Sequence, residues 1–157
     1  MKKHRLLFIC LGNICRSPMA EGALRAHAEA LGLSLEIDSA GTGDWHIGNA
    51  PDPRAQRTAL SVGGEDISGL RARQVRESDF QEYDYILAMD SNNLADLRML
   101  MPDDGTAQLA LLLDFLPGHE GQGVADPYYG DEQGFSDCWK LVDRATRAFA
   151  QNLPANP

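Results

Sequence analysis

The sequence predicts an α/β protein in which a parallel sheet is covered by helices on both faces, and three observations support this. Short apolar runs alternate with longer segments whose apolar residues recur at helical spacing. Gly, Pro and Asp residues stand at the boundaries between these segments. The chain has 157 residues, an ordinary length for one domain. Because strands that alternate with helices form parallel sheets with right-handed crossovers, we expect a single domain over 1–157.

These patterns place the elements in order along the chain. The strands are expected at 5–10, 35–39, 85–89 and 108–112. The helices are expected at 18–31, 53–63, 91–101 and 132–152, with a short helix near 78–82. Ser17 is the expected N-cap of the first helix with Pro18 at its first position, Asp52 caps the second, and Asp90 or Ser91 caps the helix at 91. The loops that follow the strands meet at one edge of such a sheet, where ligands bind.

The loop at 10–17, CLGNICRS, joins the first strand to the first helix, and its residue types suit an anion. A tight loop around a helix start forms an anion-binding nest, because the N–H groups there are unpaired and the helix dipole is positive. Gly12 avoids a Cβ clash, and Asn13 tolerates a left-handed conformation. Donors around Cys10 favour its thiolate form, and Arg16 offers two parallel donors to phosphate oxygens. A thiolate in a phosphate-sized nest predicts nucleophilic attack on phosphorus.

The motif Cys-x5-Arg-Ser is the phosphate-loop signature of cysteine-dependent phosphatases, and the longer string CLGNICRSPMAE resembles the low-molecular-weight protein tyrosine phosphatases. Further matching segments are DSAGT at 38–42, DW at 44–45, PDPRA at 51–55, ARQV at 72–75, DYILAMD at 84–90 and DPYYG at 126–130. The resemblance implies a flavodoxin-like or Rossmann-like sheet with strand order 2-1-3-4. It also implies a phosphate-binding loop made of Leu11, Gly12, Asn13, Ile14 and Cys15.

The resemblance further implies metal-independent hydrolysis of phosphotyrosine monoesters through a phosphocysteine intermediate, with no cofactor. Cys10 is then the nucleophile, Arg16 binds the phosphate and stabilises the transition state, and Ser17 supports the thiolate. The leaving phenolate needs an acid, because its parent phenol has a pKa near ~10. Asp126 of DPYYG is the expected general acid and later general base, held extended by Pro127. From spacing alone this Asp-Pro pair would be read as a turn.

Two residues resemble the family's supports for this loop. Ser39 is expected to brace the loop together with Asn13, and Asp90 to orient Arg16, to cap a helix, or to do both. The family often places a histidine in this network, in a segment resembling His-x-Ala-Arg-Gln. Leu70 stands at that position here, so we expect a bracing network that is shorter or built differently.

Two aromatic residues on loops near the expected site, Trp45 and Tyr128, are candidate walls for a phenyl ring, and Tyr129 is a third candidate. Ordinary loop packing is the alternative for each of them. In eukaryotic relatives this tyrosine pair can itself be phosphorylated, which nothing in this sequence decides. Cys15 is a candidate redox partner that would protect Cys10 from irreversible oxidation by forming a disulfide, or else a small packing residue.

The composition excludes several other classes of function. The formal net charge of −9 disfavours nucleic acid as a partner, because nucleic-acid binding needs a basic face. The three cysteines form neither a disulfide framework nor a zinc pattern, and no apolar run reaches membrane-spanning length. We expect a cytoplasmic monomer of bacterial origin. Its partners would be phosphotyrosine proteins or small aryl phosphates, with inorganic phosphate as product and inhibitor.

Two other functions fit part of the pattern. Thiol-dependent arsenate reductases share the fold and resemble residues 10–17, but they need further cysteines after the third strand, and positions 80–100 contain none. A catalytically inactive phosphotyrosine-binding module is the third possibility. It is disfavoured because Cys10, Arg16 and Asp126 are all present.

Overall fold

The computed structural model describes residues 3–153 and has the α/β architecture that the sequence predicts. Its sheet has four parallel strands in the order β2-β1-β3-β4. The strands are β1 (His4–Cys10), β2 (Leu35–Gly41), β3 (Tyr85–Ala88) and β4 (Gln108–Leu111). The predicted fold class and the strand order implied by the family resemblance are therefore confirmed.

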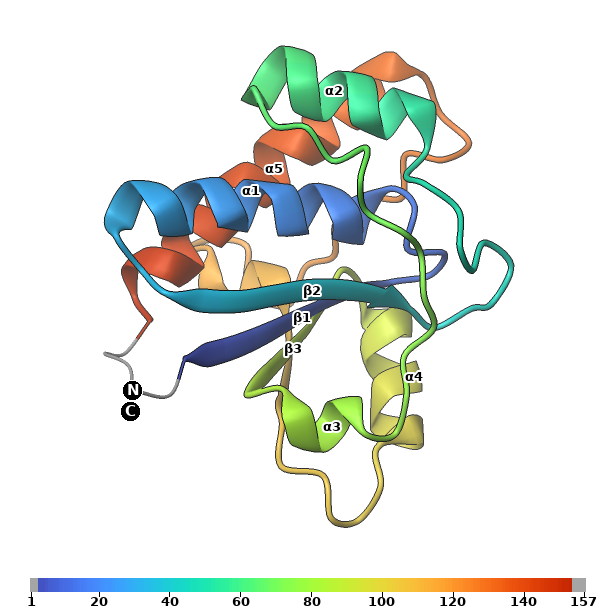
Figure 1. The fold of residues 1–157 in the computed structure, drawn as a ribbon, viewed down its shortest axis with the longest axis vertical. Coiled ribbons are helices and arrows are strands. Elements are labelled where there is room, and N and C mark those ends of the chain that lie inside the picture. The colour runs from blue at the N-terminus through green and yellow to red at the C-terminus, as the bar shows by residue number, and fades with distance from the viewer. Residues whose placement is uncertain (1–2, 154–157) are drawn as a thin grey trace.

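Helices cover both faces of the sheet, as predicted. They are α1 (Arg16–Leu31), α2 (Pro53–Gly63), α3 (Asp79–Glu82), α4 (Ser91–Leu100) and α5 (Glu132–Gln151), with a 3-10 helix, η1 (Leu112–Phe115), after β4. Helices α1, α2 and α5 lie on one side of the sheet, and α3 and α4 lie on the other (Figure 1). The helix η1 falls where the sequence predicts the end of a strand and the start of a loop.

Strand β1 lies inside the sheet between β2 and β3, and its residues 6–9 are fully buried. Leu6 and Phe8 belong to the apolar cluster shared with α1 and α5, whereas Leu7 and Ile9 belong to the cluster shared with α4. This alternation explains why β1 reads as a continuous apolar run. Burial of each such side chain stabilises the fold by roughly 1.5–3 kcal/mol. The packing on both faces holds the C-terminal end of β1, where Cys10 lies, inside the sheet rather than at its outer edges.

Aspartates cap three of the helices. Asp52 of α2, Asp90 of α4 and Asp131 of α5 each accept a backbone N–H of the first helical turn, at 2.8, 2.8 and 3.1 Å respectively. The predicted caps at Asp52 and Asp90 are thus confirmed. These contacts pair N–H groups that a helix start otherwise leaves without a partner.

The predicted start of α1 is wrong. The helix begins at Arg16, with Cys15 in the cap position, so Ser17 and Pro18 lie inside the first turn, and no side chain caps α1. The Ser17 hydroxyl lies instead 3.0 Å from the Cys10 sulfur. The cap rule fails here because this hydroxyl has partners outside its own helix. The first-turn N–H groups of α1 are left without a side-chain acceptor, unlike those of the three helices capped by aspartate.

Candidate active site

A cavity of about 300 Å³ opens at the edge of the sheet where the strands end. The loop after β1, the loop after β2 and the loop before α5 surround it. Its lining residues are Cys10, Leu11, Gly12, Ile14, Cys15, Arg16, Trp45, His46, Asp126, Tyr128 and Tyr129. The structure therefore brings most of the predicted site residues together around one cavity, although the chain separates them widely.

The loop after β1 wraps around the Cys10 sulfur. Cys10 is 3% exposed, and the backbone N–H of Asn13 donates to its Sγ at 3.3 Å. Asn13 has φ of +57°, which is the left-handed conformation that its side-chain type was expected to tolerate. The last residue of β2 must be glycine, because a Cβ on Gly41 would lie 2.7 Å from the carbonyl oxygen of Leu11. Close packing of the loop against β2 thus holds the sulfur in place.

The hydrogen bonds around Asn13 leave the Ser17 hydroxyl able to donate to the Cys10 sulfur. The backbone N–H of Arg73 donates to Asn13 Oδ1 at 3.0 Å, so the amide nitrogen of Asn13 faces Ser17. That nitrogen, Nδ2, donates to Ser17 Oγ at 2.8 Å. Because the serine oxygen already accepts this bond, its own proton is available to the Cys10 sulfur at 3.0 Å.

The bracing contact between Asn13 and Ser39 is present, and it continues to a residue that sequence reasoning missed. Asn13 Nδ2 donates to Ser39 Oγ at 3.0 Å, and Ser39 donates to Glu21 Oε1 at 2.8 Å. Arg25 donates to Glu21 Oε2 at 2.6 Å. Leu70, at the position of the family's histidine, packs against the apolar core. The network in this chain therefore runs from Asn13 through Ser39 and ends at an ion pair within α1.

Glu21 is 2% exposed, and burial raises its pKa above the ordinary value, although hydrogen bonds from Arg25 and Ser39 lower it. We expect Glu21→Ala to lower the free energy of unfolding by about 1–3 kcal/mol, because the buried Ser39 hydroxyl loses its acceptor. Urea denaturation measures this loss. Glu29→Ala is the matched control, because Glu29 is an exposed carboxylate on the same helix. Equal effects of the two variants would contradict a bracing role for Glu21.

Arg16 crosses the site and is held at one end of its guanidinium. Its Nη1 donates to Asp90 Oδ2 at 2.7 Å and to the carbonyl oxygen of Val124 at 2.9 Å. The other oxygen of Asp90 caps α4, so the two contacts considered for this residue coexist. Burial lowers the pKa of Arg16, but the neighbouring Cys10 and the carboxylates of Asp90 and Asp126 raise it above its usual value. The guanidinium therefore stays charged beside the sulfur.

Asp126 lies across the cavity on the loop before α5. Its Oδ2 is 3.6 Å from Arg16 Nη2, and its Oδ1 accepts the backbone N–H of Tyr128 at 3.1 Å. Arg54 at the start of α2 holds this loop, because its Nη2 donates to the carbonyl oxygen of Tyr128 at 2.9 Å. Sequence reasoning missed Arg54, since a helix-start arginine gives no signal of a contact more than 70 residues away.

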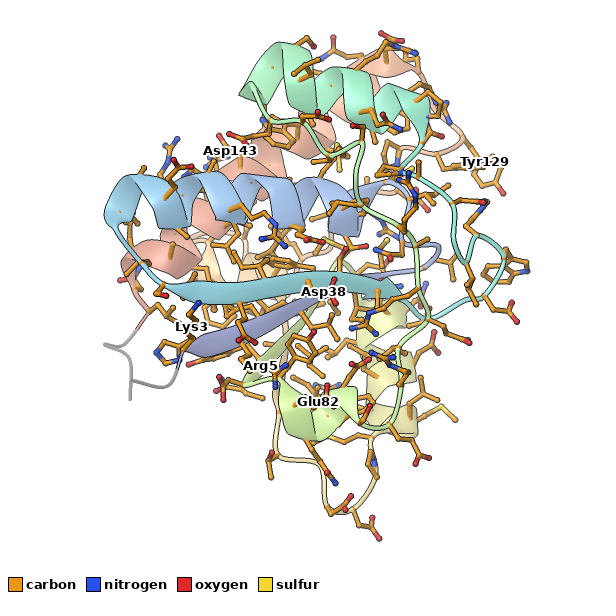
Figure 2. The ribbon with its side chains drawn as sticks, viewed as in Figure 1. Lys3, Arg5, Asp38, Glu82, Tyr129 and Asp143 are labelled. Carbon is orange, nitrogen blue, oxygen red and sulfur yellow. The ribbon has the colours of Figure 1, made fainter. Side chains whose placement is uncertain are left out.

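The three predicted aromatic residues all line the cavity, at different depths. Tyr128 is partly buried beneath the Arg54 guanidinium, whereas Trp45 is 68% exposed and Tyr129 is 94% exposed. Figure 2 shows Tyr129 projecting from the side of the molecule to which the arrow of β2 points. His46 also lines the cavity and was not predicted; its ring lies over Gly12 and is tilted against Tyr128 with centroids 6.3 Å apart.

All three cysteines are free thiols in the structure. Burial raises the pKa of Cys15 well above its usual value, and burial likewise raises the pKa of Cys138 to about 12. Both are therefore poor nucleophiles, because the thiolate is the reactive form. Among residues 3–153, no group of three or more His, Cys, Asp or Glu side chains is arranged to hold a metal ion. Over the same residues, no helix has the length and apolar character to span a membrane.

The fold, with Cys10 and Arg16 at the two ends of the loop that joins β1 to α1, places this chain in the class of small α/β proteins that carry the phosphate loop of cysteine-dependent phosphatases. The chain belongs to the low molecular weight phosphotyrosine protein phosphatase family, whose model matches residues 5–157.

Three relatives illustrate the similarity. The low molecular weight phosphotyrosine protein phosphatase of Schizosaccharomyces pombe is 44% identical over 156 residues, which cover 97% of this chain and 96% of the relative. The crystal structure of YfkJ from Bacillus subtilis has a TM-score of 0.89 at 38% identity, over 98% of this chain and 96% of that one. That of a protein tyrosine phosphatase from Entamoeba histolytica has a TM-score of 0.90 at 35% identity, over 96% and 97%. Relatives from both eukaryotes and bacteria leave the predicted bacterial origin unresolved.

Proposed function

We propose that this protein is a protein-tyrosine phosphatase that hydrolyses phosphotyrosine monoesters through a phosphocysteine intermediate. One observation carries the proposal. The Cys10 sulfur, the Arg16 guanidinium and the Asp126 carboxylate surround one cavity, so that a nucleophile, a phosphate ligand and an acid can reach the same phosphoryl group. Phosphotyrosine proteins or small aryl phosphates are the substrates, and inorganic phosphate is product and inhibitor. The reaction takes place in the cytoplasm.

In the first step the Cys10 thiolate attacks phosphorus, and the bond between phosphorus and the phenolic oxygen breaks. Asp126, in its protonated form, gives its proton to the departing phenolate. Arg16 and the N–H groups of the loop and of the α1 start stabilise the three equatorial oxygens of the transition state. The uncapped start of α1 supports this role, because its N–H groups are not engaged by a side chain.

In the second step Asp126, now a carboxylate, removes a proton from water, and the oxygen attacks the phosphocysteine. The sulfur leaves as a thiolate, and the Ser17 hydroxyl, 3.0 Å away, donates a hydrogen bond to it. Phosphate is released, and Cys10 and Asp126 return to their starting states. Arg16 and the backbone supply the positive charge in both steps, so we propose a reaction without a metal or a cofactor.

The structure weakens the arsenate-reductase alternative. That chemistry passes a disulfide from the loop to further thiols, which must become thiolates and reach the surface. Cys15 and Cys138 are 4% exposed each, and burial raises the pKa of both. An inactive phosphotyrosine-binding module is disfavoured because Cys10, Arg16 and Asp126 lie around one cavity.

Hydrolysis of p-nitrophenyl phosphate by the reduced protein in excess chelator tests the proposal. We expect turnover that is unchanged by the chelator and competitively inhibited by inorganic phosphate. Absence of turnover would contradict the phosphatase assignment, and arsenate-dependent oxidation of a dithiol would then test the reductase. Turnover that requires an added metal would contradict the mechanism.

We expect Asp126→Asn to lower kcat/KM, which reports the step in which the phenol departs, by about 10²–10⁴-fold for phenyl phosphate, because the amide cannot protonate the leaving oxygen. The loss should be smaller for p-nitrophenyl phosphate, whose leaving group needs less help from an acid. Steady-state kinetics on the two substrates measures the difference. Asp44→Asn is the control, since Asp44 is an exposed carboxylate on the neighbouring loop. An equal loss on both substrates would contradict the role of Asp126 as an acid.

A further inference from the structure

Large apolar side chains lie open to solvent in the lining of the cavity and in the loop that carries Trp45. We call Leu11, Trp45, Ile47 and Tyr129 the apolar rim; they are 42%, 68%, 57% and 94% exposed. Leu11, Trp45 and Tyr129 line the cavity, and Ile47 follows the lining residue His46 in the same loop. A single exposed apolar side chain is ordinary on a protein surface. Several of them close together indicate a binding surface.

The rim is held in place rather than loosely displayed. The backbone N–H groups of Thr42 and Gly43 donate to the carbonyl oxygens of Cys10 and Leu11, at 3.0 and 2.9 Å. The Trp45 ring lies directly on Gly43, where an added Cβ would come within 2.0 Å of a ring carbon. Such preorganisation lowers the entropy cost of binding a partner. The loop that carries Trp45 and Ile47 is therefore attached to the same backbone that surrounds the nucleophile.

A substrate must cross the rim in order to react. Cys10 is buried beneath the cavity, whereas Tyr129 at the mouth is almost fully exposed. A phosphorylated side chain that reaches the sulfur therefore leaves its own backbone and its neighbouring residues at the rim. These neighbours can then contact the rim side chains.

The charges at the mouth disfavour acidic neighbours. Among the residues that the structure describes, Arg16 and His46 are the cavity-lining side chains that can carry positive charge, and Arg16 is 3% exposed and bound to Asp90. Asp126 lines the cavity, Asp44 is exposed beside Trp45, and the whole chain carries a net charge of −9. Carboxylates next to a phosphotyrosine would meet like charge there, whereas apolar side chains would cover the rim.

We propose that the apolar rim selects phosphotyrosine segments with apolar residues beside the phosphotyrosine over segments with acidic ones. This inference rests on the proposed phosphatase function and adds a substrate preference to it. Burial of rim side chains against aliphatic or aromatic neighbours supplies the attraction.

Two phosphotyrosine peptides with leucine or aspartate at the two positions on each side test the proposal, with p-nitrophenyl phosphate as a substrate that has no neighbours. We expect kcat/KM to be about tenfold higher for the leucine peptide, and most of the ratio to survive in 0.5 M salt. A ratio near one would overturn the proposal. A ratio that falls to one in salt would also overturn it, because charge repulsion of the aspartate peptide, which salt screens, would then explain the whole preference. Inactivity on p-nitrophenyl phosphate would instead count against the phosphatase function.

Substitutions in the apolar rim test whether the rim causes the preference for apolar neighbours. Ile47→Ser and Tyr129→Ser should each lower the leucine-to-aspartate ratio by about threefold, whereas Met99→Ser should leave it unchanged. Met99 is 86% exposed on α4 and lies outside the cavity lining, so it is a matched apolar control. An unchanged ratio in both rim variants would overturn the assignment. Sedimentation showing a dimer that Ile47→Ser abolishes would also overturn it, because the rim would then bind a second copy of the chain.

Discussion

We expect Cys10→Ser to lower turnover of p-nitrophenyl phosphate by roughly 10⁴–10⁶-fold while the protein stays folded. The serine oxygen would lie near the present position of the sulfur, which is 3.0 Å from Ser17 Oγ, but it is not ionised at neutral pH and attacks phosphorus poorly. The loop N–H groups and Arg16 are unchanged by the substitution. The variant should therefore still bind inorganic phosphate, which a shift of the melting temperature on addition of phosphate measures.

Cys138→Ala is the control for this experiment. Cys138 is equally buried and belongs to the core cluster that α5 forms with β1 and α1. Its replacement should cost stability, because a small cavity remains, and it should leave kcat close to that of the unaltered protein. Residual turnover of Cys10→Ser above about 1% would remove Cys10 from the role of nucleophile. A fall in Cys138→Ala as large as that in Cys10→Ser would point to folding rather than chemistry.

The fold could be predicted because its signals are local and mutually consistent. The apolar run at 6–9 and the helical spacing of apolar residues in 132–152 each had one reasonable interpretation, and both elements form as expected. The caps Asp52 and Asp90 could be predicted for the same reason. The strand order could not be predicted in this way, because the local pattern does not say which strands are neighbours in the sheet. Only the family resemblance implied the order.

Ser17 shows where local rules fail. As a sequence signal, Ser-Pro at a helix start predicts an N-cap, and that prediction ignores any partner that the fold brings from elsewhere. Here the hydroxyl lies between the Cys10 sulfur and the Asn13 amide, and the helix starts earlier. The local preference is overridden because the tertiary fold gives the hydroxyl partners in the loop before the helix.

Glu21 and His46 could not be assigned roles from the sequence. A single glutamate in a helix is usually a solvated surface residue, and only the packing of α1 on β2 brings Glu21 to Ser39. His46 lines the cavity because its loop folds back over Gly12, and no spacing in the sequence encodes that return. The catalytic candidates were found through a motif, whereas their supports depend on tertiary contacts.

Arg16→Lys is the second substitution from which we expect a large effect, a fall in kcat/KM of about 10²–10⁴-fold. Lysine keeps the charge, so the comparison isolates the geometry of the guanidinium. Nη1 of Arg16 is already bound to Asp90 and to Val124 O, and we expect the remaining N–H groups of the guanidinium to bind the phosphate. A single ammonium cannot keep these tethers and also offer two parallel donors to phosphate oxygens.

Steady-state kinetics and phosphate inhibition measure the two parts of this effect. Inhibition by phosphate should weaken together with kcat/KM, because the same donors hold the ground state and the transition state. Arg57→Lys is the control, since Arg57 is an exposed arginine of α2 that pairs with Glu132 away from the cavity. If Arg16→Lys retained wild-type kinetics, a point charge would be sufficient. The planar guanidinium that Asp90 holds beside the cavity would then have no part in catalysis.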